Sequence, residues 1–279
     1  MTEAVVATEP RTLSPPHRHG GVVTQVRGLG EYVLLSVTTL GAPAPCPGQF
    51  YMLSTAEGWG GGADERPYLP RAFSYARARP EDDGVELDFL LEDVGPGTHR
   101  LALLAEGEAL ALLGPLGKGW RPATRGRRPL LVGGGIGVAP LLCLEEALGR
   151  DATVLLGFRS AGHAAAASLF AGAAKVATDD GSAGRRGLVT ELLDERLDRD
   201  ASATVFACGP PAMLEAVRAL CAERRVPAQL AMESGMACGF GACFGCVVPT
   251  RTGYVRLCVD GPVLDADRLD TAAVRGAGH

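Results

Sequence analysis

The chain has 279 residues, a net charge of −5 at pH 7 and 47% hydrophobic residues, which suits two or three domains with sizeable cores. The acidic balance and the lack of a basic patch interleaved with aromatic residues argue against nucleic-acid binding. The most apolar stretch, residues 129–144, is too short and too rich in glycine to cross a bilayer, and no signal-peptide pattern opens the sequence. We therefore expect a soluble, cytoplasmic protein that binds neither nucleic acid nor membrane.

The first segment of the chain, residues 1–18, contains several prolines and little periodicity, which predicts a disordered lead-in. From residue 19 to residue 124, short runs rich in β-branched and aromatic residues alternate with turn residues. About six strands at this spacing are typical of a small antiparallel barrel. The expected strands lie near residues 22–26, 32–38, 49–54, 71–76, 85–91 and 108–113.

In residues 125–225 the pattern changes to strand, glycine-rich turn and helix, which predicts a doubly wound parallel sheet. The segment 226–279 has short strand-like runs around a group of cysteines, and we expect it to form a small C-terminal cap. The fold class is therefore a multidomain β plus α/β protein. The expected strands of the sheet are 130–132, 153–157, 173–177 and 204–208, with helices at 141–148 and 211–224.

Two turns in the α/β segment have the character of phosphate-binding sites. In each, a strand leads into a glycine-containing turn that opens a helix, where unpaired N–H groups and the positive end of the helix dipole attract anions. We favour a dinucleotide bound by both turns, although the first lacks the last glycine of G-x-G-x-x-G and could serve packing alone. The two turns comprise Gly133, Gly134, Gly135, Ile136 and Gly137, and Cys208, Gly209 and Pro210.

The barrel segment offers one candidate anion site. Arg71 and Ser74 would present a guanidinium and a hydroxyl on one strand edge, and Gly97 and Thr98 could cap a ligand. Because arginine can bind phosphate through two parallel hydrogen bonds, Arg71 is suited to a pyrophosphate. A surface arginine beside a turn is the alternative.

Four cysteines near the C-terminus carry the most specific pattern in the chain. Cys238, Cys243 and Cys246 have the spacing C-x4-C-x2-C, and Cys258 follows twelve residues after Cys246. Plant-type ferredoxins hold a [2Fe–2S] cluster with this spacing. Three glycines of the loop, Gly239, Gly241 and Gly245, fit this role because glycine readily adopts positive φ angles and lets N–H groups approach sulfur closely. A structural zinc site with four thiolates is the alternative, although its cysteines usually come as two matched pairs.

Together these motifs resemble the ferredoxin–NADP reductase superfamily and, within it, the electron-transfer subunits of NAD-dependent (type B) dihydroorotate dehydrogenases. The resemblance covers residues 20–270, and in those subunits the fourth cluster cysteine precedes Asp-Gly-Pro, as Cys258 does here. The motifs that carry it are Arg71-x-Phe-Ser, Gly95-Pro-Gly-Thr98, Gly114-Pro-Leu-Gly, Gly133 to Pro140, Thr178-Asp-Asp-Gly-Ser182, Gly187-Leu-Val-Thr190, Cys208-Gly-Pro, the cysteine loop and Arg256 to Val263.

The resemblance implies FAD in the barrel, NAD(H) on the sheet and [2Fe–2S] in the cap. It places Cys208 near the nicotinamide; a small apolar residue at a strand end is the alternative. Two departures concern the flavin, because Ala72 replaces the usual proline and Leu91–Glu92 replaces an aromatic–basic pair, so Arg71 should carry more of the phosphate charge. The residues expected at FAD are Arg71, Ala72, Phe73, Ser74, Leu90, Leu91, Glu92, Gly97 and Thr98.

The resemblance also implies a function in pyrimidine biosynthesis. In the resembling enzymes an FMN-containing catalytic subunit oxidises dihydroorotate to orotate, electrons pass through the cluster and FAD to NAD+, and two copies of each subunit form a heterotetramer. FAD must lie between the other two groups, because nicotinamide exchanges electron pairs, a cluster exchanges single electrons, and a flavin exchanges both. A related reductase serving an oxygenase, hydrogenase or ferredoxin is one alternative. A non-enzymatic redox sensor is another, although a sensor does not need two nucleotide sites.

Two questions stay open at this level. Arg159 and Ser160 follow the second strand of the sheet and could bind the 2′-phosphate of NADP, whereas the resemblance favours NAD. Phe240 and Phe244 flank the cluster cysteines. Because a module of about 55 residues buries such groups poorly, we expect them to dock the partner subunit, with inward packing against the barrel as the alternative.

Overall fold

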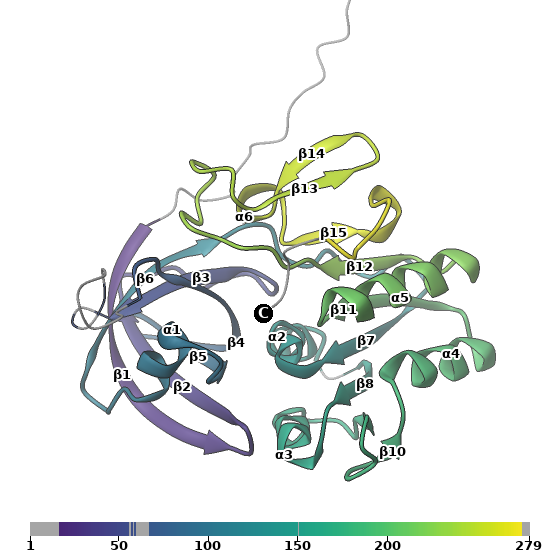
Figure 1. Cartoon of the computed structure of the whole chain (residues 1–279), viewed down its shortest axis with the longest axis horizontal. Coiled ribbons are helices and arrows are strands. Elements are labelled where there is room, and N and C mark those ends of the chain that lie inside the picture. The colour runs from purple at the N-terminus through teal and green to yellow at the C-terminus, as the bar shows by residue number, and fades with distance from the viewer. Residues whose placement is uncertain (1–16, 56, 58, 60–66, 150, 275–279) are drawn as a thin grey trace, which may run out of the picture.

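The computed structural model describes residues 17–274 except 56, 58, 60–66 and 150. The N-terminal part forms a closed antiparallel barrel, as predicted, with strand order β1-β2-β5-β4-β3-β6 (Figure 1). Side chains such as those of Leu35, Val37 and Phe89 fill its interior, because alternate residues of a strand point to the same side. The strands are β1 (His17–Leu29), β2 (Tyr32–Leu40), β3 (Phe50–Thr55), β4 (Arg71–Glu81), β5 (Gly84–Glu92) and β6 (Ala109–Leu116), and the short helix α1 (Pro96–Ala102) precedes β6.

The first strand begins earlier than predicted. His17 and Arg18, which the sequence pattern placed in the disordered lead-in, pair with Gly114 and Leu113 of β6. Their backbone hydrogen bonds go to a strand far along the chain, so the local sequence gave no sign of them. Residues 1–16 lie outside the described residues.

The second part is a sheet with strand order β10-β9-β8-β7-β11-β12-β15. Its strands are parallel except β15, which runs antiparallel to β12. The predicted doubly wound architecture is confirmed, since one group of helices packs on the barrel side and another on the opposite side. The strands are β7 (Arg128–Gly134), β8 (Thr153–Phe158), β9 (Lys175–Thr178), β10 (Arg185–Arg186), β11 (Ala203–Cys208), β12 (Ala228–Ala231) and β15 (Val263–Asp265).

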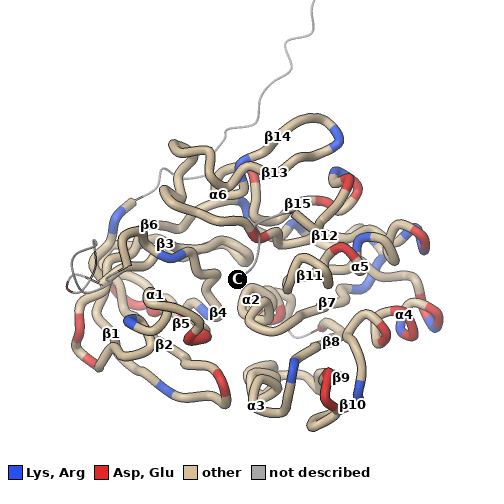
Figure 2. The backbone as a smooth tube through the Cα atoms, viewed as in Figure 1, with Lys and Arg blue, Asp and Glu red and all other residues tan. Residues whose placement is uncertain are grey.

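The helices of this part cover both faces of the sheet, one facing the barrel and the other facing outward. On the barrel side lie η1 (Gly135–Val138), α2 (Ala139–Ala147), α3 (Ala161–Ala164) and η2 (Ala165–Leu169), and on the outer side lie α4 (Val189–Arg199) and α5 (Pro211–Glu223). Figure 2 shows acidic and basic residues side by side on α4 and α5. Arg224, at the end of α5, forms ion pairs with Asp194 and Asp198 of α4 and so ties the two outer helices together.

The sheet extends beyond residue 225 into the segment that was expected to form the cap. Leu230 of β12 and Leu264 of β15 are fully buried and pair with each other across the two strands. This extension places both ends of the cap on the sheet, so the cap is anchored at its base.

The cap itself consists of the hairpin β13 (Val247–Thr250) and β14 (Gly253–Arg256), the short helix α6 (Leu257–Asp260), η3 (Ala266–Arg268) and the cysteine loop. It lies against both the barrel and the sheet (Figure 1). Val248 and Leu257 share a hydrophobic core with Phe50 and Leu116 of the barrel. Because a module this small cannot bury a core of its own, its apolar side chains pack against those of the barrel and the sheet.

The barrel and the sheet are joined at several points. Trp120 donates an indole hydrogen bond to the Pro140 carbonyl oxygen at 3.0 Å, and Arg77 of β4 forms an ion pair with Glu146 of α2 at 2.8 Å. Among the helices that the structure describes, none has the length and apolar character needed to cross a membrane.

Candidate cofactor sites

The two predicted phosphate-binding turns lie at the carboxyl ends of the neighbouring strands β7 and β11. They are packed tightly against each other. A Cβ added to Gly137 would lie 2.6 Å from the Gly209 nitrogen and 2.7 Å from the Cys208 carbonyl carbon, and one added to Gly134 would lie 2.4 Å from Met213 Sδ. The glycines therefore permit a close approach of backbone to backbone at the edge where ligands bind in open α/β sheets.

Cys208 lies at the end of β11, between these turns. Burial raises the pKa of its thiol, and the nearby Glu233 carboxylate raises the pKa further. The thiol is therefore neutral at physiological pH. Such a group packs or donates a weak hydrogen bond and does not act as a nucleophile. Its predicted place beside the nicotinamide stays a prediction.

In the barrel, Arg71 lies across the first turn of α1. A Cβ on Gly97 would meet Arg71 Nε at 2.6 Å, so the glycine leaves room for the guanidinium over the helix. Arg71 Nη1 donates to the Leu69 carbonyl oxygen at 2.6 Å. Thr98 Oγ1 accepts hydrogen bonds from the Val94 and Gly95 N–H groups at 3.0 and 2.9 Å, which fixes the start of the helix. A guanidinium beside backbone N–H groups of a helix start fits the pyrophosphate of FAD.

The other residues expected at FAD lie where β4 and β5 separate. Pairing between these two strands begins at Tyr75 and Phe89, so residues 71–74 and 90–92 present backbone edges that are not paired with each other. The residues before this point, Ala72, Phe73 and Ser74, pair with β3. The side chains of Leu90 and Leu91 are used for packing, because both are buried on opposite faces of β5. A flavin between these strands would thus meet backbone groups of β5 rather than leucine side chains.

Glu92, which stands where a basic residue was expected, faces the sheet. Its carboxylate forms an ion pair with Arg159 and lies 3.4 Å from His163 Nε2. Ser160 Oγ lies 3.0 Å from His163 Nδ1 on the other side of the ring. Arg159 is the residue that could bind a 2′-phosphate, and Glu92 is its ion-pair partner.

The four cysteines lie together in the cap. Cys246 and Cys258 are buried with their Sγ atoms 3.2 Å apart, whereas Cys238 is half-buried and Cys243 is exposed. The N–H groups of Cys243 and Gly245 point at Cys238 Sγ and Cys243 Sγ, each at 3.4 Å. Such donors stabilise thiolates, which are the form that binds iron.

The loop conformation agrees with the predicted role of its glycines in part. Gly239 and Gly241 adopt φ angles of +79° and +88°, as expected for a loop that turns several sulfurs toward one centre. At the third position the left-handed residue is Phe244, with φ of +59°, and not Gly245. The Gly245 N–H instead donates to Cys243 Sγ, and a Cβ there would lie at ordinary contact distance, 3.5 Å, from that sulfur, so the structure gives no steric reason for glycine at this position.

The surroundings lower the pKa of two of the cluster thiols and raise that of a third. Burial raises the pKa of Cys238, but backbone N–H donors, first that of Cys243, outweigh burial and lower it to about 7. The hydrogen bond with Cys258 lowers the pKa of Cys246 to about 6 and raises that of Cys258. In the described part of the chain, no three His, Cys, Asp or Glu side chains surround a single ion position. A binuclear cluster needs only two thiolates at each iron, so the donor set fits [2Fe–2S].

Phe240 and Phe244 are 48% and 62% exposed, so the alternative of inward packing against the barrel is wrong.

Sequence reasoning missed Met213, whose sulfur fills the space beside Gly134 and Gly209. Its position in the first turn of the helix that follows Cys208-Gly-Pro-Pro could have indicated that it lies beside the phosphate-binding turns.

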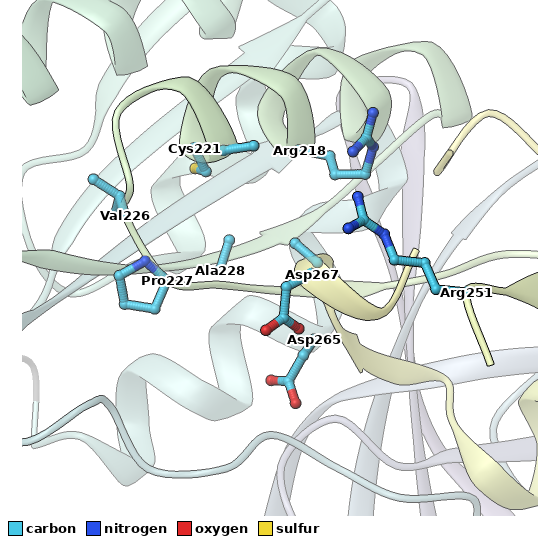
Figure 3. Close-up of a pocket in the computed structure, with 10 residues that line it drawn as sticks. Arg218, Cys221, Val226, Pro227, Ala228, Arg251, Asp265 and Asp267 are labelled. Atoms are coloured by element: carbon cyan, nitrogen blue, oxygen red, sulfur yellow. The ribbon is translucent and has the colours of Figure 1, made fainter. Parts of the chain in front are cut away.

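A separate pocket lies between α5 and the chain around β15 and η3 (Figure 3). Its charges are balanced locally, because Arg218 pairs with Glu215 at 2.6 Å and Arg251 with Asp270 at 3.5 Å. The phosphate-binding turns do not contribute to it, and we assign it no cofactor. It is lined by Arg218, Cys221, Ala222, Val226, Pro227, Ala228, Arg251, Asp265, Ala266 and Asp267.

Comparison with known proteins decides the family. Residues 233–270, which include all four cysteines, match the family model described as the iron–sulfur cluster binding domain of dihydroorotate dehydrogenase B. The dihydroorotate dehydrogenase B (NAD(+)) electron transfer subunit of Caldanaerobacter subterraneus subsp. tengcongensis is 34% identical over 230 residues, which cover 81% of this chain and 87% of that protein. The chain belongs to this family of electron-transfer subunits. The subunit of the same name from Shouchella clausii is 39% identical over 78% of this chain and 83% of that protein.

Solved structures agree with this family. The electron-transfer subunit shares its fold with a chain of the NADH-dependent reduced ferredoxin–NADP oxidoreductase, with a TM-score of 0.74 and 25% identity over 90% of both chains. The ferredoxin reductase of carbazole 1,9a-dioxygenase matches with a TM-score of 0.64 and 23% identity over 77% of this chain and 68% of that chain. The resemblance to the ferredoxin–NADP reductase superfamily, the fold class and the oxidoreductase class are thus confirmed, and the cysteine module is an iron–sulfur domain.

Proposed function

We propose that this chain passes electrons from a catalytic subunit that oxidises dihydroorotate, through its [2Fe–2S] cluster and FAD, to NAD+. One observation carries the proposal: the cysteine loop packs on the strand beside the expected flavin strand. A Cβ on Gly239 would lie 2.5 Å from Met52 Cγ, and Met52 pairs with Ala72, next to Arg71. Cys243 is exposed on the same loop. Electrons can therefore enter at the surface and leave toward the barrel.

The chain supplies binding and orientation rather than acid–base chemistry. When bound, FAD would supply both one-electron and two-electron chemistry, which suits a position between a cluster and a nicotinamide. Arg71 and the backbone N–H groups of Gly97 and Thr98 would hold the FAD pyrophosphate, and the backbone edges at 72–74 and 90–92 would flank the flavin. The turns at 133–137 and 208–210 would hold the NAD(H) phosphates, with Cys208 as the residue proposed near the nicotinamide.

The exposed rings of Phe240 and Phe244 are the docking surface for the FMN-containing catalytic subunit, in a heterotetramer of two plus two. Apolar groups beside an exposed cluster ligand exclude water when a partner covers them, and they bring the two redox groups close. The cytoplasmic location expected from the sequence belongs to the same proposal.

Purification of the chain with the product of its neighbouring gene tests this function. The pair should form orotate from dihydroorotate with NAD+. The isolated chain should oxidise NADH with an artificial acceptor such as ferricyanide and leave dihydroorotate untouched. An isolated chain that oxidised dihydroorotate would overturn the proposal.

The docking surface has its own test. Phe240→Asp and Phe244→Asp should abolish electron transfer from the partner while preserving NADH oxidation with ferricyanide. Leu40→Asp is the matched control, because Leu40 is a 73% exposed apolar residue of the barrel outside the cysteine loop. Coupled activity that survives both phenylalanine changes would place the partner elsewhere.

A second function is a flavin and iron–sulfur reductase that serves another electron partner. The observation that favours it is the 90% coverage by a chain of the NADH-dependent reduced ferredoxin–NADP oxidoreductase. The same co-purification separates the two functions. Failure to form orotate, together with rapid NADH-dependent reduction of a ferredoxin, would support this alternative.

A further inference from the structure

The side chain of Arg256 spans the cysteine loop. Its Nη1 donates a hydrogen bond to the Gly241 carbonyl oxygen at 2.7 Å, and its guanidinium carbon lies 4.9 Å from the centre of the Phe244 ring. Gly241 belongs to the four-residue segment between Cys238 and Cys243, and Phe244 to the two-residue segment that follows. One guanidinium therefore fixes both segments of the C-x4-C-x2-C loop.

Arg256 is itself held firmly. Its N–H donates to Asp260 Oδ2 at 3.0 Å, and its backbone pairs with Val247 across the hairpin of β13 and β14. The next residue, Leu257, donates to the Cys246 carbonyl oxygen at 3.1 Å. The guanidinium thus links the more exposed side of the loop, with Cys238 and Cys243, to the buried side.

The charge of Arg256 has a second consequence for the group that the four cysteines bind. The cysteines bind iron as thiolates, and reduction adds one further negative charge to the cluster. An arginine stays protonated at every accessible pH, and Arg256 is half-buried, so solvent screens its charge only partly. A fixed positive charge beside the loop favours the reduced form over the oxidised form.

We propose that Arg256 is a positioning residue of the cluster, whose guanidinium closes the cysteine loop and whose charge raises the reduction potential of the cluster. A cluster held by the four cysteines would carry the two electrons of each oxidation one at a time, so its reduction potential would set how readily it is reduced by the donor and reoxidised by FAD. This inference rests on the cluster of the proposed function and does not depend on the identity of the partner.

Redox titration of the anaerobically purified full chain tests the proposal, with the reduced cluster followed by electron paramagnetic resonance so that flavin does not interfere. Arg256→Gln should lower the equilibrium constant for cluster reduction about tenfold, which is 59 mV for a one-electron couple. Arg256→Lys keeps the charge and should shift the potential by less than half as much. Arg251→Gln is the matched control, because Arg251 lies at the other end of the hairpin and pairs with Asp270.

The outcomes separate this inference from the proposed function. If the wild-type chain is found to contain no iron and no sulfide, it has no cluster, and the proposed function is overturned. An Arg256→Gln variant with full iron and an unchanged potential would overturn only the role of Arg256. If Arg256→Gln loses its cluster, the Arg256→Lys variant provides the test. An Arg256→Lys variant with the wild-type iron content and a reduction potential near that of the wild type supports the proposal. An Arg256→Lys variant that also lacks iron overturns it.

Discussion

Alanine at Gly137 should push apart the two turns that form the proposed NAD(H) site. Its Cβ would lie 2.6 Å from the Gly209 nitrogen and 2.7 Å from the Cys208 carbonyl carbon. Both are backbone atoms, which cannot rotate away as a side chain can. Overpacking of this kind costs about 1–3 kcal/mol. If the whole cost falls on nucleotide binding, NADH affinity should drop by about 5- to 150-fold.

The assay is the KM for NADH with ferricyanide as acceptor, together with the thermal unfolding temperature of the FAD-bound chain. Gly133→Ala should be milder, because the atoms nearest its Cβ, at 3.0–3.1 Å, belong to side chains that can adjust. Gly20→Ala is the neutral control, since its Cβ would meet nothing within 4 Å. A wild-type KM and unfolding temperature for Gly137→Ala would refute the reasoning, as would greater damage from Gly133→Ala.

Three further predictions concern the flavin, the cluster and the choice of nucleotide. Arg71→Ala should lower FAD content after dialysis, because it removes a charge-assisted contact worth about 1.5–3 kcal/mol; full occupancy would show that the phosphates are held elsewhere. Cys243→Ser should remove the visible cluster bands, and about two irons and two sulfides per chain, while FAD stays bound; one zinc and no sulfide in the unmodified chain would contradict this. Glu92→Gln should raise the activity ratio of NADPH to NADH about two- to fivefold, because it frees Arg159 for a 2′-phosphate and the exposed ion pair that it breaks contributes at most about 1 kcal/mol. Glu146→Gln breaks a different ion pair between barrel and sheet, and a similar change in that control would count against a specific role for Glu92.

The sequence predicted elements whose signal is local. The strands of the barrel, the turn at 133–137 and the cysteine spacing all depend on residues within a few positions of one another, and the structure has each of them. Boundaries were less accurate. His17 and Arg18 join β1, and β12 and β15 join the sheet, because hydrogen-bond partners far along the chain decide where a strand begins and ends.

The sequence also misjudged what some side chains do. Glu92 looked like a missing positive charge at the flavin, and the fold turns it toward Arg159, a residue of another domain. Gly245 looked like a residue with positive φ, and the loop gives that conformation to Phe244, over which Arg256 stacks. Neither contact could be predicted from the residues next to Glu92 or Phe244 in the sequence.

By itself, the sequence determined the chemistry this protein can carry, because thiolates, a guanidinium and glycine turns have the same intrinsic properties in any fold. Only the tertiary structure decided how these parts combine. It brought Gly137 against Gly209, Gly239 against Met52 and Arg256 against Gly241, and it left Phe240 exposed. Such contacts join segments that are distant in the chain, and their geometry depends on how the barrel, the sheet and the cap pack against one another.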